Sequence, residues 1–135
     1  MTVHRTKIEE LDPSIAESLV ANDILFIDSS HVLRPQGDVV YEYLNMLGRL
    51  QKGVLIHVHD IFTPRDYPDA WVLDDRRLRN EQYLLEAFLC FNPAFKIIGA
   101  LNWLWHSHSD RLDRACPLLL MNGGEPGSFW FTRVA

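Results

Sequence analysis

Four polar residues that can carry chemistry follow two apolar runs of this 135-residue chain. Asp28 and His31 come at the end of "DILFID", and His59 and Asp60 come at the end of "VLIHVH". A carboxylate accepts hydrogen bonds or binds a cation, and an imidazole exchanges a proton near neutral pH. The pattern therefore indicates a place where a ligand is bound or a proton is moved.

Two strands joined by a helix must position these residues. Residues 23–28 form a continuous β-branched and aromatic run, which predicts a strand buried on both faces of a parallel sheet. Residues 54–61 predict a second strand. Between them, a helix is predicted from Asp38 by apolar residues at helical spacing: Val40, Tyr43, Leu44, Leu47 and Leu50. In a strand-helix-strand unit the strands are parallel, and ligands bind beyond their carboxyl ends.

The rest of the chain predicts a second unit of the same kind. Residues 63–77 are polar and marked by prolines, which predicts a loop that covers a site like a lid. A helix is expected over 80–91, a strand over 95–104 and a terminal strand over 128–135. The apolar face of that helix is expected to comprise Tyr83, Leu84, Ala87, Phe88 and Phe91. We therefore expect one α/β domain over 1–135, with a mostly parallel sheet, an antiparallel C-terminal strand and helices on the faces.

Composition limits the class of protein. The chain is 47% hydrophobic and 23% charged, as in soluble globular domains. Its net charge of -5 argues against binding to nucleic acid, and no apolar run approaches the roughly 20 residues that span a membrane. Cys90 and Cys116 lack metal-ligand spacing, and the chain does not open with a secretory signal. We expect a cytoplasmic protein without a nucleic-acid or membrane partner.

Three segments in order carry a resemblance to a known family. "DILFIDSSH", "QKGVLIHVHDIF" and "GSFWFTRV" resemble the second half of a class I S-adenosylmethionine-dependent methyltransferase domain. The resemblance implies a Rossmann-like sheet in which these are the fourth, fifth and antiparallel seventh strands, with the sixth in 95–104. It also matches "TVHRTKIEELD" to the third strand and the turn after it. The implied activity is methyl transfer from S-adenosylmethionine to the hydroxyl of a small-molecule acceptor.

The chain departs from the family on the cofactor side. The family has a glycine-rich loop after its first strand and an acidic residue ending its second, but the first glycine here is Gly37 and no G-x-G-x-x-G is present. We therefore expect a truncated domain that starts midway through the family's fold and is weak or inactive alone. The alternative is a catalytically silent methyltransferase-like domain that serves interaction or oligomerisation.

The resemblance also implies roles for residues at the strand ends. Some O-methyltransferases of this fold hold a divalent cation there, which implies Asp28, His59 and Asp60 as ligands of Mg, Mn or Zn, with His59 standing where those enzymes have an acidic residue. Asp28 is also the candidate contact to the cofactor or substrate, unless it only caps a turn. His31 is the candidate general base, and a solvated loop histidine is its alternative.

The tryptophans and the remaining histidines are mostly expected to have structural or solvent-exposed positions. Trp71, in the expected loop, is the candidate that closes over the acceptor, whereas the other tryptophans are expected in the core or at its edge. His57 is expected to be a hydrogen-bonded core residue. His106 and His108 are expected to be solvated, with a surface metal pair as the alternative.

The strand over residues 24–28 lacks its usual neighbour in this resemblance, which raises the question of assembly. Its edge would carry unpaired backbone groups, and such edges favour pairing with another strand. Either "TVHRTKI" moves across to pair with it, or two chains join through equivalent edges. The expected partners are therefore a small-molecule acceptor and either a second copy, giving a homo-oligomer, or a partner chain that supplies missing strands.

Overall fold

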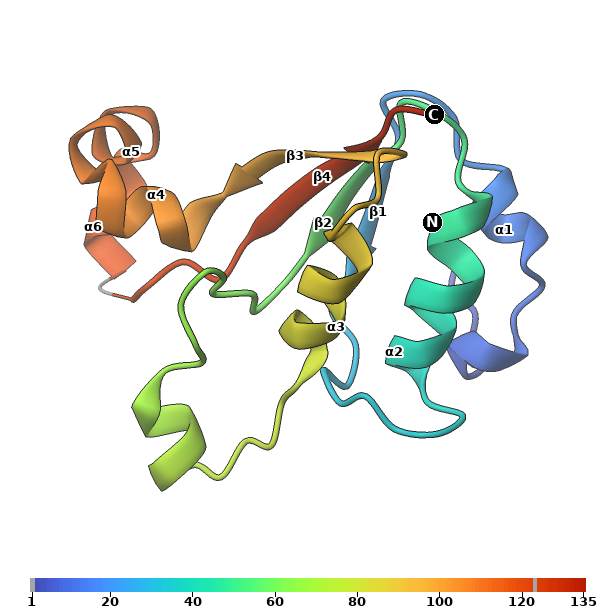
Figure 1. Ribbon diagram of the computed structural model, residues 1–135, viewed down its shortest axis with the longest axis horizontal. Coiled ribbons are helices and arrows are strands. Elements are labelled where there is room, and N and C mark those ends of the chain that lie inside the picture. The colour runs from blue at the N-terminus through green and yellow to red at the C-terminus, as the bar shows by residue number, and fades with distance from the viewer. Residues whose placement is uncertain (1, 123) are drawn as a thin grey trace.

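The computed structural model describes residues 2–122 and 124–135 and has an α/β architecture (Figure 1). Within these residues one open sheet is formed by β1 (Ile24–Ile27), β2 (Leu55–Val58), β3 (Phe95–Ala100) and β4 (Phe129–Arg133). The strand order is β1-β2-β4-β3. The predicted α/β class is confirmed.

The directions of the strands confirm the antiparallel C-terminal strand. β1 pairs with β2 in parallel, whereas β4 lies between β2 and β3 and is antiparallel to both. β1, β2 and β3 therefore run in one direction and β4 runs against them. Most strands are parallel in direction, but the described sheet contains one parallel pair and two antiparallel pairs, so its pairing is mixed.

Helices of different kinds connect the strands. The chain enters the sheet through two short turns, η1 (Ile8–Glu10) and α1 (Ser14–Glu17). The connection from β1 to β2 is one helical segment with three geometries, namely α2 (Asp38–Tyr41), the π-helical η2 (Glu42–Met46) and the 3-10 helix η3 (Leu47–Arg49). The connection from β2 to β3 holds η4 (Ala70–Asp74) and α3 (Glu81–Leu89). α4 (Leu101–Ser107), α5 (Ser109–Ala115) and α6 (Pro117–Asn122) precede β4 and cluster beyond the end of β3 (Figure 1).

The predicted helix after Asp38 is present, and most of its predicted face is buried. Tyr43, Leu47 and Leu50 are buried as expected, whereas Leu44 is exposed. Leu44 lies inside the π-helical turn η2, which is wider than an α-helical turn, and the unpredicted Met46 of the same turn is buried.

α3 also exists where the sequence predicts it; of the predicted face, Leu84 and Phe88 pack against the core, but the most deeply buried positions differ. Glu81, Gln82 and Leu85 are buried, whereas Tyr83 is exposed and Phe91, beyond the helix end, is 99% exposed. Two polar side chains thus occupy the core-facing positions of the helix, which the apolar stripe of the sequence does not indicate.

Two further predictions about elements are wrong. Residues 101–104 begin α4 instead of continuing β3, because the pairing of β3 with β4 ends at Ala100 and Phe129. Residues 2–8 form no strand, since only η1 begins there, at Ile8. In the described part of the chain β1 pairs with β2 alone, so β1 is an edge strand and the N-terminal segment does not cover it.

The register of the four strands separates the sheet into two faces. One face, which we call the covered face, carries two rows of side chains and packs against α1, η2 and α3. Its rows are Leu25, Ile56, Phe131, Ile97 and Ile27, Val58, Phe129, Ala100. The opposite face, which we call the open face, carries the rows Ile24, Leu55, Thr132, Lys96 and Phe26, His57, Trp130, Gly99.

The open face corrects the prediction of a fully buried first strand. Ile24 and Phe26 are each 54% exposed, whereas Ile27 is buried on the covered face. In Figure 1, α2 and α3 lie on the same side of the sheet. Only one face of β1 is therefore buried among the described residues.

Candidate functional site

The carboxyl ends of β1 and β2 bring the four predicted polar residues together. Because the strands are parallel and Ile27 pairs with Val58, the residues that follow each strand emerge at the same edge of the sheet. His31 Nε2 lies 3.3 Å from Asp28 Oδ1 and 4.0 Å from Asp60 Oδ2, and His59 Nε2 lies 3.3 Å from Asp60 Oδ1. We call these residues, with Glu81 and Arg79, the strand-end cluster.

His31 is the centre of the strand-end cluster and is almost inaccessible, at 3% exposure. Its Nδ1 lies 2.7 Å from Glu81 Oε2, and its Nε2 faces Asp28. A carboxylate therefore lies beside each nitrogen of the ring. Burial by itself lowers the pKa of His31, but the hydrogen bond and negative charge of Glu81, with Asp60, outweigh burial and leave the pKa raised. His31 therefore holds its proton more strongly than an exposed imidazole does.

Glu81 is fully buried in the first turn of α3 and receives a second hydrogen bond. The Tyr43 hydroxyl donates to Glu81 Oε1 at 3.0 Å, while His31 occupies the other oxygen. The Asn80 and Glu81 backbone N–H groups both donate to the His31 carbonyl, at 3.0 and 3.3 Å. The loop after β1, η2 and the start of α3 are thus joined by one polar network.

Asp60 is shared between three cations or potential cations. Its carboxylate forms an ion pair with Arg79, lies 3.3 Å from His59 Nε2 and faces His31. His31 and Asp60 both have positive φ, 59° and 56°, in the left-handed region that few residues other than glycine adopt. The chain adopts this conformation immediately after two adjacent parallel strands, as is common at functional sites.

A second buried carboxyl group lies beside this network. Glu42, in η2, accepts a hydrogen bond from the Ser29 hydroxyl at 2.9 Å. Burial, together with the negative charges of Glu81 and Asp38, raises the pKa of Glu42 to about 7. Its protonation therefore changes within the physiological range.

Two residues of the strand-end cluster reach solvent. The side chain of Asp28 is 48% exposed and that of His59 is 44% exposed, whereas the Asp60 side chain is 17% exposed. A ligand that approaches this edge meets an exposed carboxylate and an exposed imidazole. The buried members hold these two groups in place.

The remaining predicted residues lie elsewhere. Trp71, in η4, packs on Phe62 at 5.1 Å and lies under the guanidinium groups of Arg77 and Arg79, at 4.2 and 4.8 Å. It therefore reaches the strand-end cluster only through Arg79. The segment between β2 and α3 that carries it extends away from the sheet in Figure 1.

His57 is hydrogen-bonded as predicted but does not lie in the core. It is on the open face, with Nε2 2.6 Å from Ser128 Oγ and its ring stacked on Trp130 at 4.3 Å. Burial and the neighbouring His59 lower the pKa of His57. His106 belongs to α4 and lies 3.2 Å from Glu125 Oε2, and His108 is exposed.

Sequence reasoning missed half of the network. Glu81, Tyr43, Glu42 and Arg79 were not predicted as site residues, although each contacts the predicted ones or lies beside them. A carboxylate at the start of a helix is a weak signal, because it usually interacts with the helix dipole in solvent. Its burial depends on His31, which is 50 positions away.

The predicted metal ligands already make contacts with one another and with Arg79. Across residues 2–122 and 124–135 no group of three His, Cys, Asp or Glu side chains is arranged to hold a metal. Asp60 is already paired with Arg79, a cation that competes with a metal. The predicted trio of Asp28, His59 and Asp60 therefore does not fit a metal in this arrangement.

The first glycine of the sequence, Gly37, is packed against by the chain itself. Gly37, which precedes α2, has its Cβ position filled by Arg34 Cγ at 2.8 Å, so this glycine serves the chain's own packing and opens no space for a ligand. Asp28 is an exposed carboxylate at the strand ends.

Fold and site together define an α/β protein with a buried charged network at the carboxyl ends of two parallel strands. No described helix is long and apolar enough to cross a membrane. The chain matches no family model, no curated protein and no solved structure.

Proposed function

We propose that this chain forms the acceptor side of an S-adenosylmethionine-dependent methyltransferase that acts on a small-molecule hydroxyl. The observation that carries the proposal is the strand-end cluster, in which a buried His31 joins Asp28, Asp60 and Glu81 beyond two adjacent parallel strands. Buried and perturbed charges in such a position are typical of functional sites. The resemblance of the strand sequences to this family supports the same assignment.

In this proposal His59 is the group that takes the proton from the acceptor hydroxyl. Its Nε2 faces Asp60 Oδ1 at 3.3 Å, so when that nitrogen carries the hydrogen, Nδ1 has the lone pair that accepts a proton. Asp60 orients the imidazole, and Arg79 holds Asp60. His31, the base that the sequence predicts, is too deeply buried for direct contact and is the positioning residue between Asp28 and Asp60.

S-adenosylmethionine, when bound, supplies the methyl group. Asp28 is the contact that this chain offers it, and we propose that another polypeptide segment completes the cofactor site. No metal takes part in this proposal, since Arg79 already neutralises Asp60.

The proposal is tested by titration of S-adenosylmethionine into the purified chain, observed by calorimetry and NMR. We expect weak binding that is lost in Asp28→Ala and retained in Asp74→Ala, which removes an exposed carboxylate of η4 far along the chain from the strand ends. Resonance shifts should centre on Asp28 and His59. Absence of binding, or equal binding by both variants, would overturn the proposal.

A second candidate function is an interaction domain, and the exposed edge of the sheet favours it. β1 has no partner on its outer side among the described residues, and its Ile24 and Phe26 are each 54% exposed. Two chains could pair through β1 about a two-fold axis. This candidate does not require S-adenosylmethionine.

Light scattering at micromolar concentration tests the interaction function. We expect a mass above that of one 15.7 kDa chain. Ile24→Lys should return the chain to a monomer, whereas Val72→Lys, at an exposed valine of η4, should not. A monomer at all concentrations would rule out self-association through this edge.

A further inference from the structure

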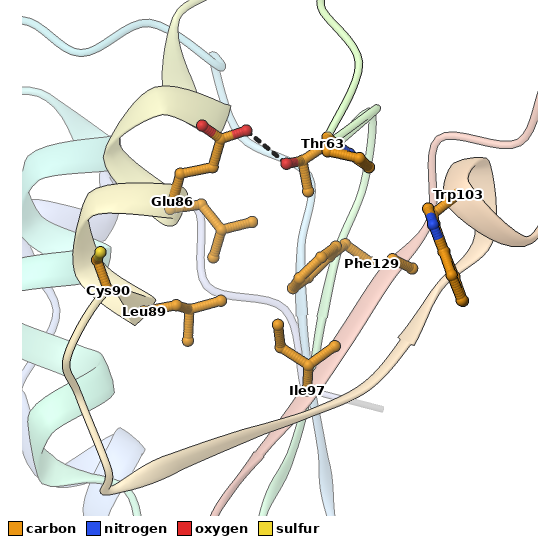
Figure 2. Close-up of a pocket in the computed structure, with 10 residues that line it drawn as sticks. Thr63, Glu86, Leu89, Cys90, Ile97, Trp103 and Phe129 are labelled. Atoms are coloured by element: carbon orange, nitrogen blue, oxygen red, sulfur yellow. Dashed lines mark hydrogen bonds between the residues drawn. The ribbon is translucent and has the colours of Figure 1, made fainter.

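A separate cavity of about 370 Å³ lies between α3 and the end of the sheet (Figure 2). Its walls are largely apolar and come from α3, β3, β4 and α4: Leu85, Leu89, Ile97, Ala100, Phe129 and Trp103. A cavity of this size suits one ring with a short chain. It shares no lining residue with the strand-end cluster.

The local geometry explains why the cavity exists. Leu85 and Leu89 are four residues apart and lie on one face of α3, while Ile97 and Phe129 form the opposite wall on the sheet (Figure 2). A bulge between Ile97 and Gly99 shifts β3 relative to β4 at this point. The end of β3 is thereby displaced, and Ile97 remains 53% exposed although it belongs to a covered row.

One charged side chain lines this cavity. Glu86 accepts a hydrogen bond from the Thr63 hydroxyl, which holds its carboxylate at the rim (Figure 2). Among the lining residues that the structure describes there is no lysine, arginine or histidine. The indole of Trp103 lies at the other side of the opening, where a π face attracts cations.

We propose that this cavity binds a small apolar molecule that carries a protonated amine. The apolar body displaces water from the leucine, isoleucine and phenylalanine walls, and the ammonium group bonds to Glu86. A carboxylate beside an apolar wall discriminates an amine from an alcohol of equal shape, because a charge-assisted hydrogen bond is the stronger one. The site is independent of methyl transfer and does not need the strand-end cluster.

The probes for this test are 2-phenylethylamine and 2-phenylethanol, which differ in the polar group alone. Dissociation constants come from NMR titration of the whole chain. We expect the amine to bind about tenfold more tightly than the alcohol, which corresponds to about 1.4 kcal/mol. Glu86→Gln should reduce the amine to the affinity of the alcohol.

Two neighbouring isoleucines provide a matched control for the location. Ile97→Trp should fill the cavity and abolish binding of both probes, whereas Ile98→Trp should leave binding unchanged. Ile98 is 54% exposed, nearly the same as Ile97, but does not line the cavity. Equal effects of the two variants would overturn the assignment of this cavity.

The two free cysteines give an independent readout. Cys90 lines the cavity and Cys116 does not, and both are exposed. The amine should slow alkylation of Cys90 by iodoacetamide and leave Cys116 unaffected. Failure of both probes to bind, equal affinities of amine and alcohol, or unprotected Cys90 would each contradict the proposal, whatever the outcome of the S-adenosylmethionine titration.

Discussion

The two faces of the sheet are built from the same strands, yet they differ in almost every physical property. On the covered face Ile56, Phe131 and Val58 are fully buried against the helices. On the open face Phe26 is half exposed, and His57 stacks on Trp130 at the surface. Alternate residues of one strand are therefore in different environments, because the described helices that pack on the sheet lie on its covered face.

The carboxyl end of the covered side adds a third environment. There the helices bury charge as well as apolar surface, with Glu81 and His31 paired and Glu42 close by. Burial of charge is tolerated only with partners, and each of these groups has one. The covered side is thus packed and paired except at the cavity beside Ile97 and Phe129, whereas the open face and the β1 edge expose apolar side chains.

Loss of a large side chain from the covered face should have the largest effect. Phe131→Ala removes a fully buried ring between β2 and β3, and we expect the free energy of unfolding to fall by about 3–5 kcal/mol. Urea denaturation followed by fluorescence measures this loss. A change below about 1 kcal/mol would mean that this face is not the core of the protein.

Removal of the charge of Glu81 should be the next largest effect. Glu81→Gln leaves the buried His31 ring without its closest carboxylate, and we expect a loss of about 2–3 kcal/mol. Glu86→Gln, on the exposed side of the same helix, serves as the control and should change stability by less than about 0.5 kcal/mol. Similar unfolding midpoints for the two variants would show that the buried pair does not stabilise the fold.

The pH dependence of stability tests the buried charges together. The pKa of Glu42 is about 7 in the folded protein against an ordinary value of 4.5, so the folded state binds the proton more tightly. Stability should therefore fall as pH rises from about 4.5 to about 7, by at most about 3 kcal/mol. The raised pKa of His31 acts in the same direction, since its contribution is complete below 6.5 and is lost above the raised value.

Glu42→Gln separates these two contributions. In this variant the free energy of unfolding should no longer fall between about pH 5 and about pH 7. The decrease at higher pH that His31 causes should remain. Denaturation series at several pH values provide the measurement. An unchanged pH profile would place the titration on other groups.

Truncation on the open face should have the smallest effect. Phe26→Ala removes a ring that is 54% exposed, and we expect a loss below about 1 kcal/mol in the isolated chain. Because Phe26→Ala and Phe131→Ala remove the same side chain, the two losses compare the open face with the covered face directly. If two copies cover the open face, the loss should instead grow with protein concentration, which unfolding curves at two concentrations would reveal.

The sequence by itself determined the main elements. The apolar runs that became β1, β2 and β4 and the helical periodicity before β2 and β3 depend on local chemistry, so they are readable from the chain. The convergence of Asp28, His31, His59 and Asp60 also followed from the sequence, because parallel neighbours end at the same edge. Their chemical roles remain predictions.

Only the tertiary structure decided which surfaces are buried. The inward position of Glu81 and Gln82 depends on partners far along the chain: His31, Tyr43, Arg65 and the Phe62 backbone. No local pattern encodes such pairs, since burial of a carboxylate is favourable only when the distant partner is in place. For the same reason Phe26 and Ile27 are equally apolar in sequence, and the helices packed on one side alone determine which of them is buried.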